Sequence, residues 1–244
     1  MEIRFDGKRA LVTGAGKGIG RDIAKALHKC GADTVALSRT QADLDSLKDE
    51  CPGIQIVTQD LSDWTGTRNT VSDLGNFDLL VNNAAVARRA SFLEYQEKDI
   101  DITFDTNFKA VFNVTQVIAR GMVERGTGGA IVNISSIAAT RAFNSACAYA
   151  PSKAALDSLT QVLALELGPK KVRVNSVLPT GVMTDMGRKG LSDPDMVKPF
   201  IARTPLGRFA EVEEVTNAVL FLLSDKAAMI NGTMLPVDGG YLAN

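Results

Sequence analysis

Tyr149 and Lys153 form a pair of side chains that can move a proton. They are four positions apart, so on a helix both lie on one face and the lysine ammonium can approach the phenol. A free phenol has a pKa of about 10, and a nearby cation favours the phenolate. Ser136 comes thirteen positions earlier, at the end of a predicted strand, where its hydroxyl can hydrogen-bond a substrate oxygen. The pair alone is weak evidence, because ordinary amphipathic helices with a surface lysine show the same spacing.

A glycine-rich turn near the N-terminus can hold a phosphate group. The run Thr13-Gly14-Ala15-Gly16-Lys17-Gly18-Ile19-Gly20 follows a predicted strand and precedes a predicted helix. The N–H groups and the dipole at the start of that helix can hold a pyrophosphate, and glycine lets the backbone approach it closely. A lone glycine pattern is more often just a turn, but strand, turn and helix in this order indicate a dinucleotide site.

The end of the second predicted strand indicates which dinucleotide binds. An NAD enzyme usually places a carboxylate there, about 20 residues beyond the turn, whereas this chain has Ser38, Arg39 and Thr40. Arg39 can pair with a 2′-phosphate, Lys17 can add a second cation, and the two hydroxyls can donate hydrogen bonds. NADP(H) is therefore the predicted cofactor. The alternative is that Arg39 and Lys17 are solvated surface charges and that Thr40 only caps a helix.

Short apolar runs alternate with segments of helical period along the whole chain. Continuous runs of this kind suit parallel strands that are buried on both faces. Strands are predicted at 10–13, 34–37, 54–57, 79–81, 130–134, 172–177 and 233–237, and helices near 18–30, 41–50, 63–73, 97–125 with a break, 149–167 and 211–224. Thr40 and Asp43 resemble a capping box at the start of the second helix. We expect one α/β domain over 1–244, a doubly wound parallel sheet of about seven strands with helices on both faces.

These motifs together resemble the short-chain dehydrogenase/reductase family, in its classical branch. The resemblance rests on the Thr-Gly-x-x-x-Gly-x-Gly spacing, on Asn82-Asn83-Ala84-Ala85 after the fourth strand, and on Asn107, Ser136, Tyr149 and Lys153, and it covers the whole chain. It implies a Rossmann-type fold and a reaction in which a hydride from the reduced cofactor turns a carbonyl into an alcohol. The expected catalytic residues are Asn107, Ser136, Tyr149 and Lys153.

The resemblance implies a role for each of these side chains. Tyr149 is the general acid, Ser136 holds the substrate oxygen, and Lys153 binds the nicotinamide ribose. Asn107 holds a water that links Lys153 to solvent, although an Asn before a helix can also be a simple cap. The expected cofactor-binding residues are Gly14, Lys17, Gly18, Ile19, Gly20, Ser38, Arg39, Thr40, Asp60, Leu61, Asn83, Ala84, Tyr149, Lys153, Val182 and Thr184.

The segment between Ser136 and Tyr149 is expected to form the substrate wall. Within the family, the chain most resembles reductases of α-dicarbonyls, simple ketones and the ketose L-xylulose, which is reduced to xylitol. The ketose-reducing members carry Gln directly after the catalytic Ser and His three residues before the Tyr, where this chain has Ile137 and Ala146. A polyhydroxylated substrate needs polar groups that pair with its hydroxyls, and few are evident here, so small dicarbonyls and ketones are slightly favoured. Arg88, Arg141 and Asn144 could still supply such groups from loops. The expected substrate-binding residues are Ser136, Ile137, Phe143, Ala146 and Tyr149, under a substrate lid at 183–203.

Composition and charge narrow the classes of partner. A net charge of -1 with a single histidine gives no basic face for nucleic acid and no polybasic segment for anionic lipid. Three widely spaced cysteines predict neither a disulfide framework nor a metal site, and no apolar run is long enough to cross a membrane. We expect a cytoplasmic enzyme that acts on a small carbonyl compound, and family habit implies a homotetramer. A 3-oxoacyl carrier-protein reductase and a non-catalytic NADP-binding sensor remain alternatives.

Overall fold

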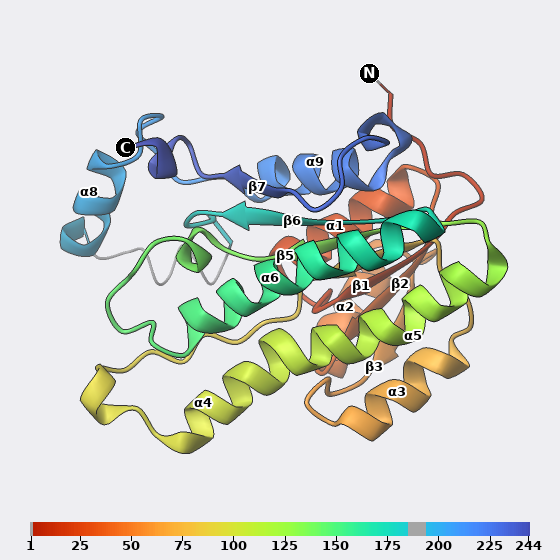
Figure 1. The fold of residues 1–244 in the computed structure, drawn as a ribbon, viewed down its shortest axis with the longest axis horizontal. Helices are drawn as coiled ribbons and strands as arrows, with labels where there is room; N and C mark the ends of the chain where they lie inside the picture. Colours follow the sequence, from red (N-terminus) through yellow and green to blue (C-terminus); the bar gives the residue numbers. More distant parts are fainter. Residues whose placement is uncertain (1, 185–193) are drawn as a thin grey trace.

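The short apolar runs form the strands of one parallel sheet (Figure 1). The computed structural model describes residues 2–184 and 194–244. The sheet has seven strands in the order β3-β2-β1-β4-β5-β6-β7. The strands are β1 (Arg9–Thr13), β2 (Asp33–Ser38), β3 (Gln55–Thr58), β4 (Leu79–Asn82), β5 (Gly129–Ile134), β6 (Val172–Pro179) and β7 (Met234–Val237). The predicted α/β fold with a doubly wound parallel sheet is confirmed.

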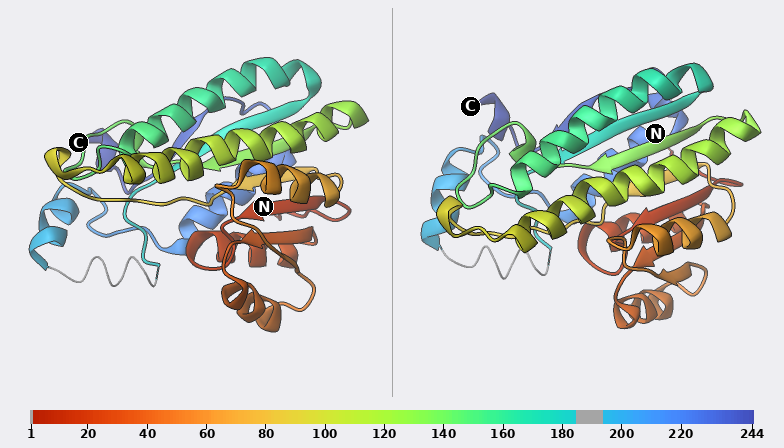
Figure 2. Two further views of the ribbon diagram at one scale, coloured as in Figure 1. Left: turned by 90° about the horizontal axis from the view of Figure 1, so that it is seen from below. Right: turned by 60° about the horizontal axis from the view of Figure 1, so that its bottom comes forward.

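Helices cover both faces of this sheet (Figure 2). The described helices are α1 (Gly18–Lys29), α2 (Gln41–Glu50), α3 (Trp64–Asp73), α4 (Glu97–Phe104), α5 (Ala110–Arg125), α6 (Tyr149–Leu167), α8 (Pro194–Ala202) and α9 (Val212–Leu223). Helices α1, α2 and α9 pack on one face, and α3, α5 and α6 pack on the other. The sheet is therefore buried on both sides, which explains why its strands are nearly continuous apolar runs.

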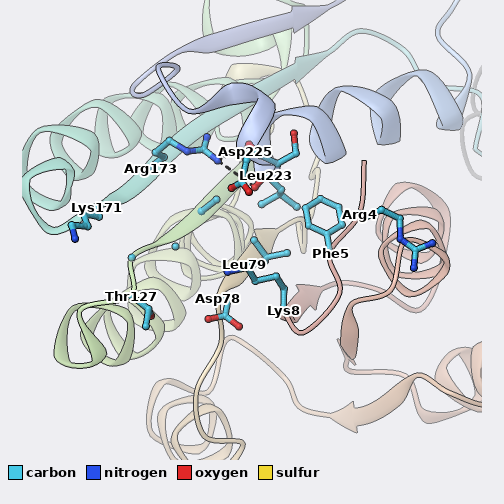
Figure 3. Close-up of a pocket in the computed structure, with 14 residues that line it drawn as sticks. Arg4, Phe5, Lys8, Asp78, Leu79, Thr127, Lys171, Arg173, Leu223 and Asp225 are labelled. Carbon is cyan, nitrogen blue, oxygen red and sulfur yellow. Dashed lines mark hydrogen bonds between the residues drawn. The ribbon is translucent and has the colours of Figure 1, made fainter. Parts of the chain in front are cut away.

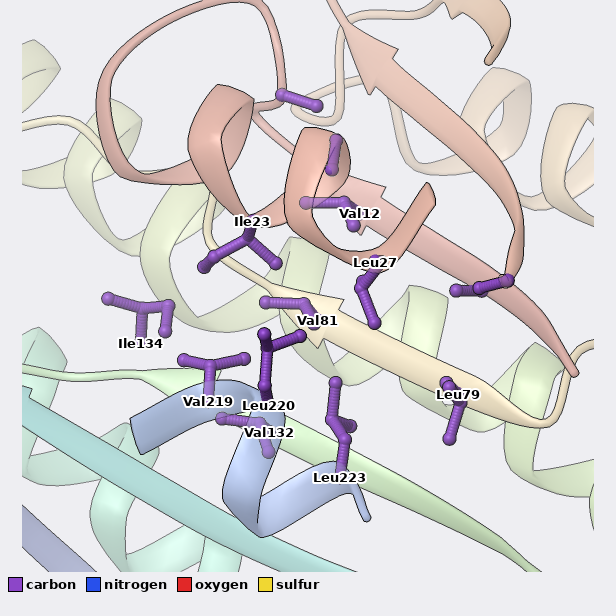
Figure 4. Packing of buried hydrophobic residues seen from close by; sticks show 14 of the residues in the cluster. Val12, Ile23, Leu27, Leu79, Val81, Val132, Ile134, Val219, Leu220 and Leu223 are labelled. Atoms are coloured by element: carbon purple, nitrogen blue, oxygen red, sulfur yellow. The ribbon is translucent and has the colours of Figure 1, made fainter. Parts of the chain in front are cut away.

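Alternate strand residues supply the core of each face (Figure 4). Val12, Val81 and Val132 point toward α1 and α9 and are fully buried. They meet Ile23 from α1 and Val219 from α9, which come from opposite ends of the chain. Their neighbours Leu11, Leu80 and Ile131 are also fully buried, and they pack against the helices of the other face.

The order of the strands reverses between β1 and β4, and this reversal positions the functional motifs. Val12 of β1 pairs with Val81 of β4, so the residues that follow both strands meet at one edge of the sheet. Asn82 likewise pairs with Asn133, and Ile134 with Val177, which brings the loops after β4, β5 and β6 to the same edge. Ligands in doubly wound sheets bind at such a reversal, beyond the carboxyl ends of the strands.

Three local expectations need correction or completion. The capping box at Thr40 is wrong, because the Thr40 side chain makes no cap hydrogen bond and Asp43 forms an ion pair with Lys17 instead. The break predicted within 97–125 is a π-helical turn, η2 (Asp105–Lys109), that joins α4 to α5. The predicted lid at 183–203 lies partly outside the described residues, and its later part forms α8, a helix that the sequence did not predict.

Candidate active site

A cleft of about 480 Å³ opens at the carboxyl ends of the strands. Most of the predicted cofactor residues line it: Gly14, Lys17, Gly18, Ile19, Ser38, Arg39, Thr40, Asp60, Leu61, Asn83, Ala84 and Thr184. Leu37, Gln59, Ala85, Val86 and Thr106 complete the lining and were not predicted. The sequence could have indicated most of these residues as part of the cleft, because they are directly adjacent to residues that were predicted.

A smaller cavity of about 180 Å³ lies at the opposite, amino-terminal edge of the sheet (Figure 3). Its wall includes Arg173, whose guanidinium donates to the carbonyl oxygens of Leu223 and Ser224 at the end of α9. Burial lowers the pKa of Arg173. The arginine satisfies the last carbonyls of the helix, so its role is structural, and none of the predicted site residues reaches this cavity.

The glycine turn is held in place by Asn83, which follows β4. The amide of Asn83 donates to the carbonyl oxygens of Thr13 at 3.0 Å and Gly14 at 3.1 Å. Gly14 has φ +64, and a Cβ there would come within 2.7 Å of the Cα of Ala84. A Cβ at Gly20 would clash with the same Asn83 amide. Gly20 does not line the cleft, so its contribution is to let α1 pack against Asn83.

Arg39 is an exposed cation of the cleft, and its charge acts on the nearby Asp60 carboxylate. Its side chain is exposed and forms no ion pair with any residue that the structure describes, so it can meet an anion without breaking an existing contact. Lys17, the second predicted cation, lies 2.9 Å from Asp43. Asp60 accepts from the Ser62 backbone at 3.0 Å and hydroxyl at 2.8 Å, and these bonds help to lower its pKa. Asp60 is therefore a turn residue that also lines the cleft.

Ser136 and Tyr149 come together beside this cleft. Ser136 follows β5 with an extended backbone, and its hydroxyl accepts from the Ala138 N–H at 3.1 Å. The same hydroxyl faces the side chain of Tyr149, the first residue of α6, and acts to lower the pKa of the phenol. Burial of the phenol has the larger effect and raises that pKa. The phenol is therefore protonated at neutral pH and can act as an acid.

Lys153 lies one turn further along α6 and is almost fully buried, with 2% of its surface exposed. Its Nζ lies 5.8 Å from the centre of the Tyr149 ring and donates to the Ile134 carbonyl oxygen at 2.7 Å. Burial lowers its pKa to about 8. The structure thus brings the predicted Ser, Tyr and Lys together, as their spacing indicated.

Asn107 links the cleft to the start of α6. It is fully buried in the π-helical turn η2, where its side chain accepts from the Val86 N–H at 2.8 Å and donates to the Val86 carbonyl at 3.0 Å. It also donates to the Ser152 hydroxyl at 2.9 Å, which in turn donates to the Tyr149 carbonyl at 2.7 Å. The alternative interpretation of Asn107 as a helix cap is wrong, because its side chain caps no helix N–H.

Two of the predicted substrate residues, Ile137 and Phe143, form an apolar group with partners from the C-terminal part of the chain. Ile137 is buried against Leu178 and Tyr241. The Phe143 ring lies 6.0 Å from that of Phe200 in α8 and 6.0 Å from that of Tyr241, measured between centroids. Phe200 and Tyr241 stack at 4.5 Å. Phe143 is thus held by aromatic packing that joins the Ser136 loop to α8 and to the C-terminal residues.

Arg88 and Arg89 are adjacent in the loop after β4 and have different surroundings. Arg88 was expected to supply a polar group for the substrate, but its guanidinium faces Asp99, with a closest approach of 3.8 Å. Arg89 is exposed, and its positive charge lowers the pKa of Tyr149. Arg89 was not predicted, since the sequence of this loop does not show which arginine charge acts on the phenol.

Val182 and Thr184 follow β6 on the far side of the cleft. Val182 forms an isolated parallel bridge with Ala210, and the Thr184 N–H donates to the Val182 carbonyl at 2.8 Å. A Cβ at Gly18 would lie 3.2 Å from the Thr184 methyl group, so this segment closes over the glycine turn. Thr184 lines the cleft, whereas Val182 positions it.

The matches to known proteins extend over nearly the whole chain. The family profile described as enoyl-(acyl carrier protein) reductase matches residues 14–242. The L-xylulose reductase of Bos taurus is 55% identical over 243 residues, which cover 100% of both chains. The chain belongs to the short-chain dehydrogenase/reductase family. The predicted family membership is thereby confirmed.

Further members of the family resemble the chain over its full length. The D-erythrulose reductase of Gallus gallus is 55% identical and covers 100% of this chain and 99% of its own. Carbonyl reductase [NADPH] 2 of Sus scrofa is 51% identical and covers 100% of both chains. A solved structure titled a putative 2-deoxy-D-gluconate 3-dehydrogenase from Agrobacterium tumefaciens with bound NADP has a TM-score of 0.93 and 33% identity, and covers 100% of this chain and 99% of its own.

Neither a membrane span nor a metal centre is found among residues 2–184 and 194–244. None of the helices described there has the length and apolar character that a membrane span requires. The same part of the chain contains no group of three or more His, Cys, Asp or Glu residues that could hold a metal ion.

Proposed function

We propose that this protein is an NADPH-dependent reductase of small carbonyl compounds. The chain is an oxidoreductase of the short-chain family, and its relatives include proteins named L-xylulose reductase, D-erythrulose reductase and NADPH carbonyl reductase. The observation that carries the proposal is that Ser136, Tyr149 and Lys153 lie together beside a cleft that is also lined by the exposed cation Arg39.

The residues of the cleft fit NADP(H). The glycine turn presents backbone N–H groups at the start of α1, and Gly14 leaves the space that close approach to a phosphate requires. Ser38, Arg39 and Thr40 line the cleft at the end of β2, where an NAD enzyme would place a carboxylate. The name of the porcine relative and the NADP bound in the Agrobacterium structure agree with this choice.

NADPH, when bound, would supply a hydride to the carbonyl carbon. Tyr149, Lys153 and Ser136 would stabilise the negative charge that forms on the carbonyl oxygen. The carbonyl oxygen gains negative charge as the hydride arrives. Tyr149 donates its phenolic proton to that oxygen, so the product is an alcohol and Tyr149 becomes a phenolate. Lys153 stabilises the phenolate electrostatically, and Ser136 donates a hydrogen bond to the substrate oxygen.

Asn107 is assigned a positioning role in this reaction. Its three hydrogen bonds fix Val86, which lines the cleft, and Ser152, which is bonded to Tyr149. We also propose, from the family resemblance, that Asn107 holds a water through which Lys153 exchanges protons with solvent. Tyr149 could regain its proton by this route after each turnover.

The substrate wall favours small dicarbonyls and ketones over sugars. Ile137, Phe143 and Ala146 are apolar, and Ile137 and Ala146 are buried. A sugar would bring several hydroxyl groups against this wall, and each unpaired one would lose its hydrogen bonds to water. We place α8 over this pocket as part of the substrate lid, since Phe200 packs beside Phe143.

A homotetramer is part of the proposal. Phe112 on α5 is 40% exposed, and Val162 and Leu165 on α6 are 48% and 79% exposed. The two helices are joined through Val111 and Leu159, so these side chains lie on neighbouring elements. Exposed apolar groups of this kind favour burial against another copy. Light scattering in solution tests the assembly, and a monomer would contradict it.

A cytoplasmic location is also proposed. Cys30, Cys51 and Cys147 are all free thiols. Free thiols persist in the reducing cytosol, whereas secreted proteins tend to oxidise them to disulfides.

A kinetic panel with NADPH tests the proposed function. Diacetyl, L-xylulose, an aromatic ketone and an acetoacetyl thioester are compared by kcat/KM, and we expect the highest value for diacetyl. A higher value for the thioester would favour a 3-oxoacyl carrier-protein reductase. NADPH binding without consumption on any substrate would leave only the sensor hypothesis.

A further inference from the structure

We propose that Asp157 is the buried counter-charge that keeps Lys153 a cation, and that it thereby sets the upper pH limit of the reaction at Tyr149. No role for Asp157 follows from the reaction described above. The part that concerns catalysis rests on the proposed function, whereas the coupling between Asp157 and Lys153 does not.

Tyr149, Lys153 and Asp157 occupy successive turns of one face of α6. Each is four positions from the next, so the three side chains form a row against the sheet. Only 2% of Lys153 and 7% of Asp157 are exposed. A buried charge is costly unless an opposite charge offsets it, so a buried lysine and a buried aspartate one turn apart can offset each other's charge.

The Asp157 carboxylate is not satisfied by hydrogen bonds. Neither of its oxygens has a hydrogen-bond partner of acceptable geometry. Ser135 donates to the Lys153 backbone carbonyl at 3.4 Å, and Ser176 is bonded to Thr160 at 2.8 Å. The hydroxyls of Ser135 and Ser176 face the carboxylate and lower its pKa, but burial has the larger effect and raises it. The carboxylate therefore depends on a cation for its ionisation.

Lys153 is the cation that acts on it. The Nζ atom points to the Ile134 carbonyl, so the attraction acts through space over one helical turn. The negative charge of Asp157 raises the pKa of Lys153 against the effect of burial, and Lys153 lowers the pKa of Asp157. Within the described chain, no other charged group contributes to either shift.

Among the described residues, the polar side chains hydrogen-bonded around the pair are uncharged. Asn133 comes from β5, Ser135 from the residue after it, Ser176 from β6, Asn107 from η2, and Ser152 and Thr160 from α6 itself. Tyr149 is the remaining titratable group, and the charge that acts on it from outside this layer is that of Arg89. Asp105 and Lys109 of η2 pair with each other at 2.7 Å on the surface.

The coupling is tested by lysine NMR on the whole protein, which requires no turnover. Lysine labelled with 13C at Cε is titrated in the wild type, Asp157→Asn and Glu166→Gln, and Lys153→Ala assigns the signal. We expect Asp157→Asn to lower the pKa of Lys153 by about one unit, as the loss of a charge one turn away should. Glu166→Gln removes an exposed carboxylate from the same helix and should change nothing. An unchanged or higher pKa of Lys153 in Asp157→Asn overturns the proposal.

A second measurement needs only the wild type and covers the case in which Asp157→Asn does not fold. The proposal requires Asp157 to be ionised at pH 7, which 13C NMR of its carboxyl carbon reports directly. A protonated Asp157 at pH 7 overturns the proposal without any variant.

The pH profile of diacetyl reduction then tests the catalytic consequence. Lys153 supports Tyr149 only as a cation, so activity should fall as the pH rises through the pKa of Lys153. We expect the alkaline limb of kcat to move to lower pH by about one unit in Asp157→Asn, with kcat near pH 6 retained and Asp157→Glu restoring part of the shift. If the NMR shift is found and diacetyl is not reduced even by the wild type, the coupling stands and the proposed function fails. An NMR shift without a matching movement of the limb would overturn the catalytic part alone.

Discussion

Replacing Arg39 by aspartate should reverse much of the preference for NADPH. Arg39 lines the cleft at the end of β2, is exposed, and forms no ion pair with a residue that the structure describes. If NADPH binds as proposed, the guanidinium meets the 2′-phosphate that distinguishes NADPH from NADH. In the variant, a carboxylate faces that phosphate and can instead accept a hydrogen bond from the 2′-hydroxyl of NADH.

The size of the effect follows from the exposure of Arg39. A hydrogen bond to a charged group contributes about 1.5–3 kcal/mol, and the lower end applies to an exposed side chain that solvent screens. The loss of this contact should reduce kcat/KM for NADPH about 10-fold. Repulsion between the new carboxylate and the phosphate adds about 1 kcal/mol at water-like screening, or roughly another 5-fold. We expect the NADPH/NADH ratio of kcat/KM to fall about 50-fold.

Steady-state kinetics with both cofactors on one substrate measure this ratio. Lys226→Asp makes the same change of charge at an exposed position beyond the end of α9 and should leave the ratio unaltered. Lys17→Met should lower the ratio less than Arg39→Asp, because Lys17 is already paired with Asp43. A change of less than 3-fold in Arg39→Asp would show that Arg39 is only a solvated surface charge.

Other substitutions separate the roles of the remaining site residues. Tyr149→Phe should bind NADPH as the wild type does, by fluorescence titration, and lose more than 90% of turnover, because the proton donor is gone; turnover above a tenth of wild type would remove that role. Asn107→Ala should lower the free energy of unfolding in urea by about 3 kcal/mol, since it deletes three hydrogen bonds of a fully buried side chain, and a loss below 1 kcal/mol would contradict this. Phe200→Ala should raise KM for diacetyl more than it lowers kcat, because Phe200 supports the wall at Phe143 without reaching the reacting atoms; an unchanged KM would place α8 away from the pocket.

The sheet and the glycine turn could be predicted because their signals are local. A parallel strand inside the sheet is a short apolar run, so each of the seven strands is visible within three to six residues. Tyr149 and Lys153 share a face because both lie on one regular helix. The four-residue spacing also places Asp157 on the same face of α6 as Tyr149 and Lys153. Spacing alone does not show that this aspartate is buried.

The contacts of the loops could not be predicted, because they depend on segments that are distant in the sequence. Asn107 was assigned from resemblance, yet its partners Val86 and Ser152 are 21 and 45 positions away. The choice between Arg88 and Arg89 depends on how the loop after β4 turns, and both residues are equally polar.

Phe143 shows how this limit bears on substrate choice. An apolar residue between the catalytic Ser and Tyr fits a substrate wall, but it fits a packing contact equally well, and the structure shows a ring stacked near Phe200 and Tyr241. Those partners come from α8 and from the last residues of the chain. The shape of the wall is therefore set jointly by a loop after β5 and by elements that follow β6 and β7. A substitution at Tyr241, which has no place in the reaction, should change substrate preference through Phe143.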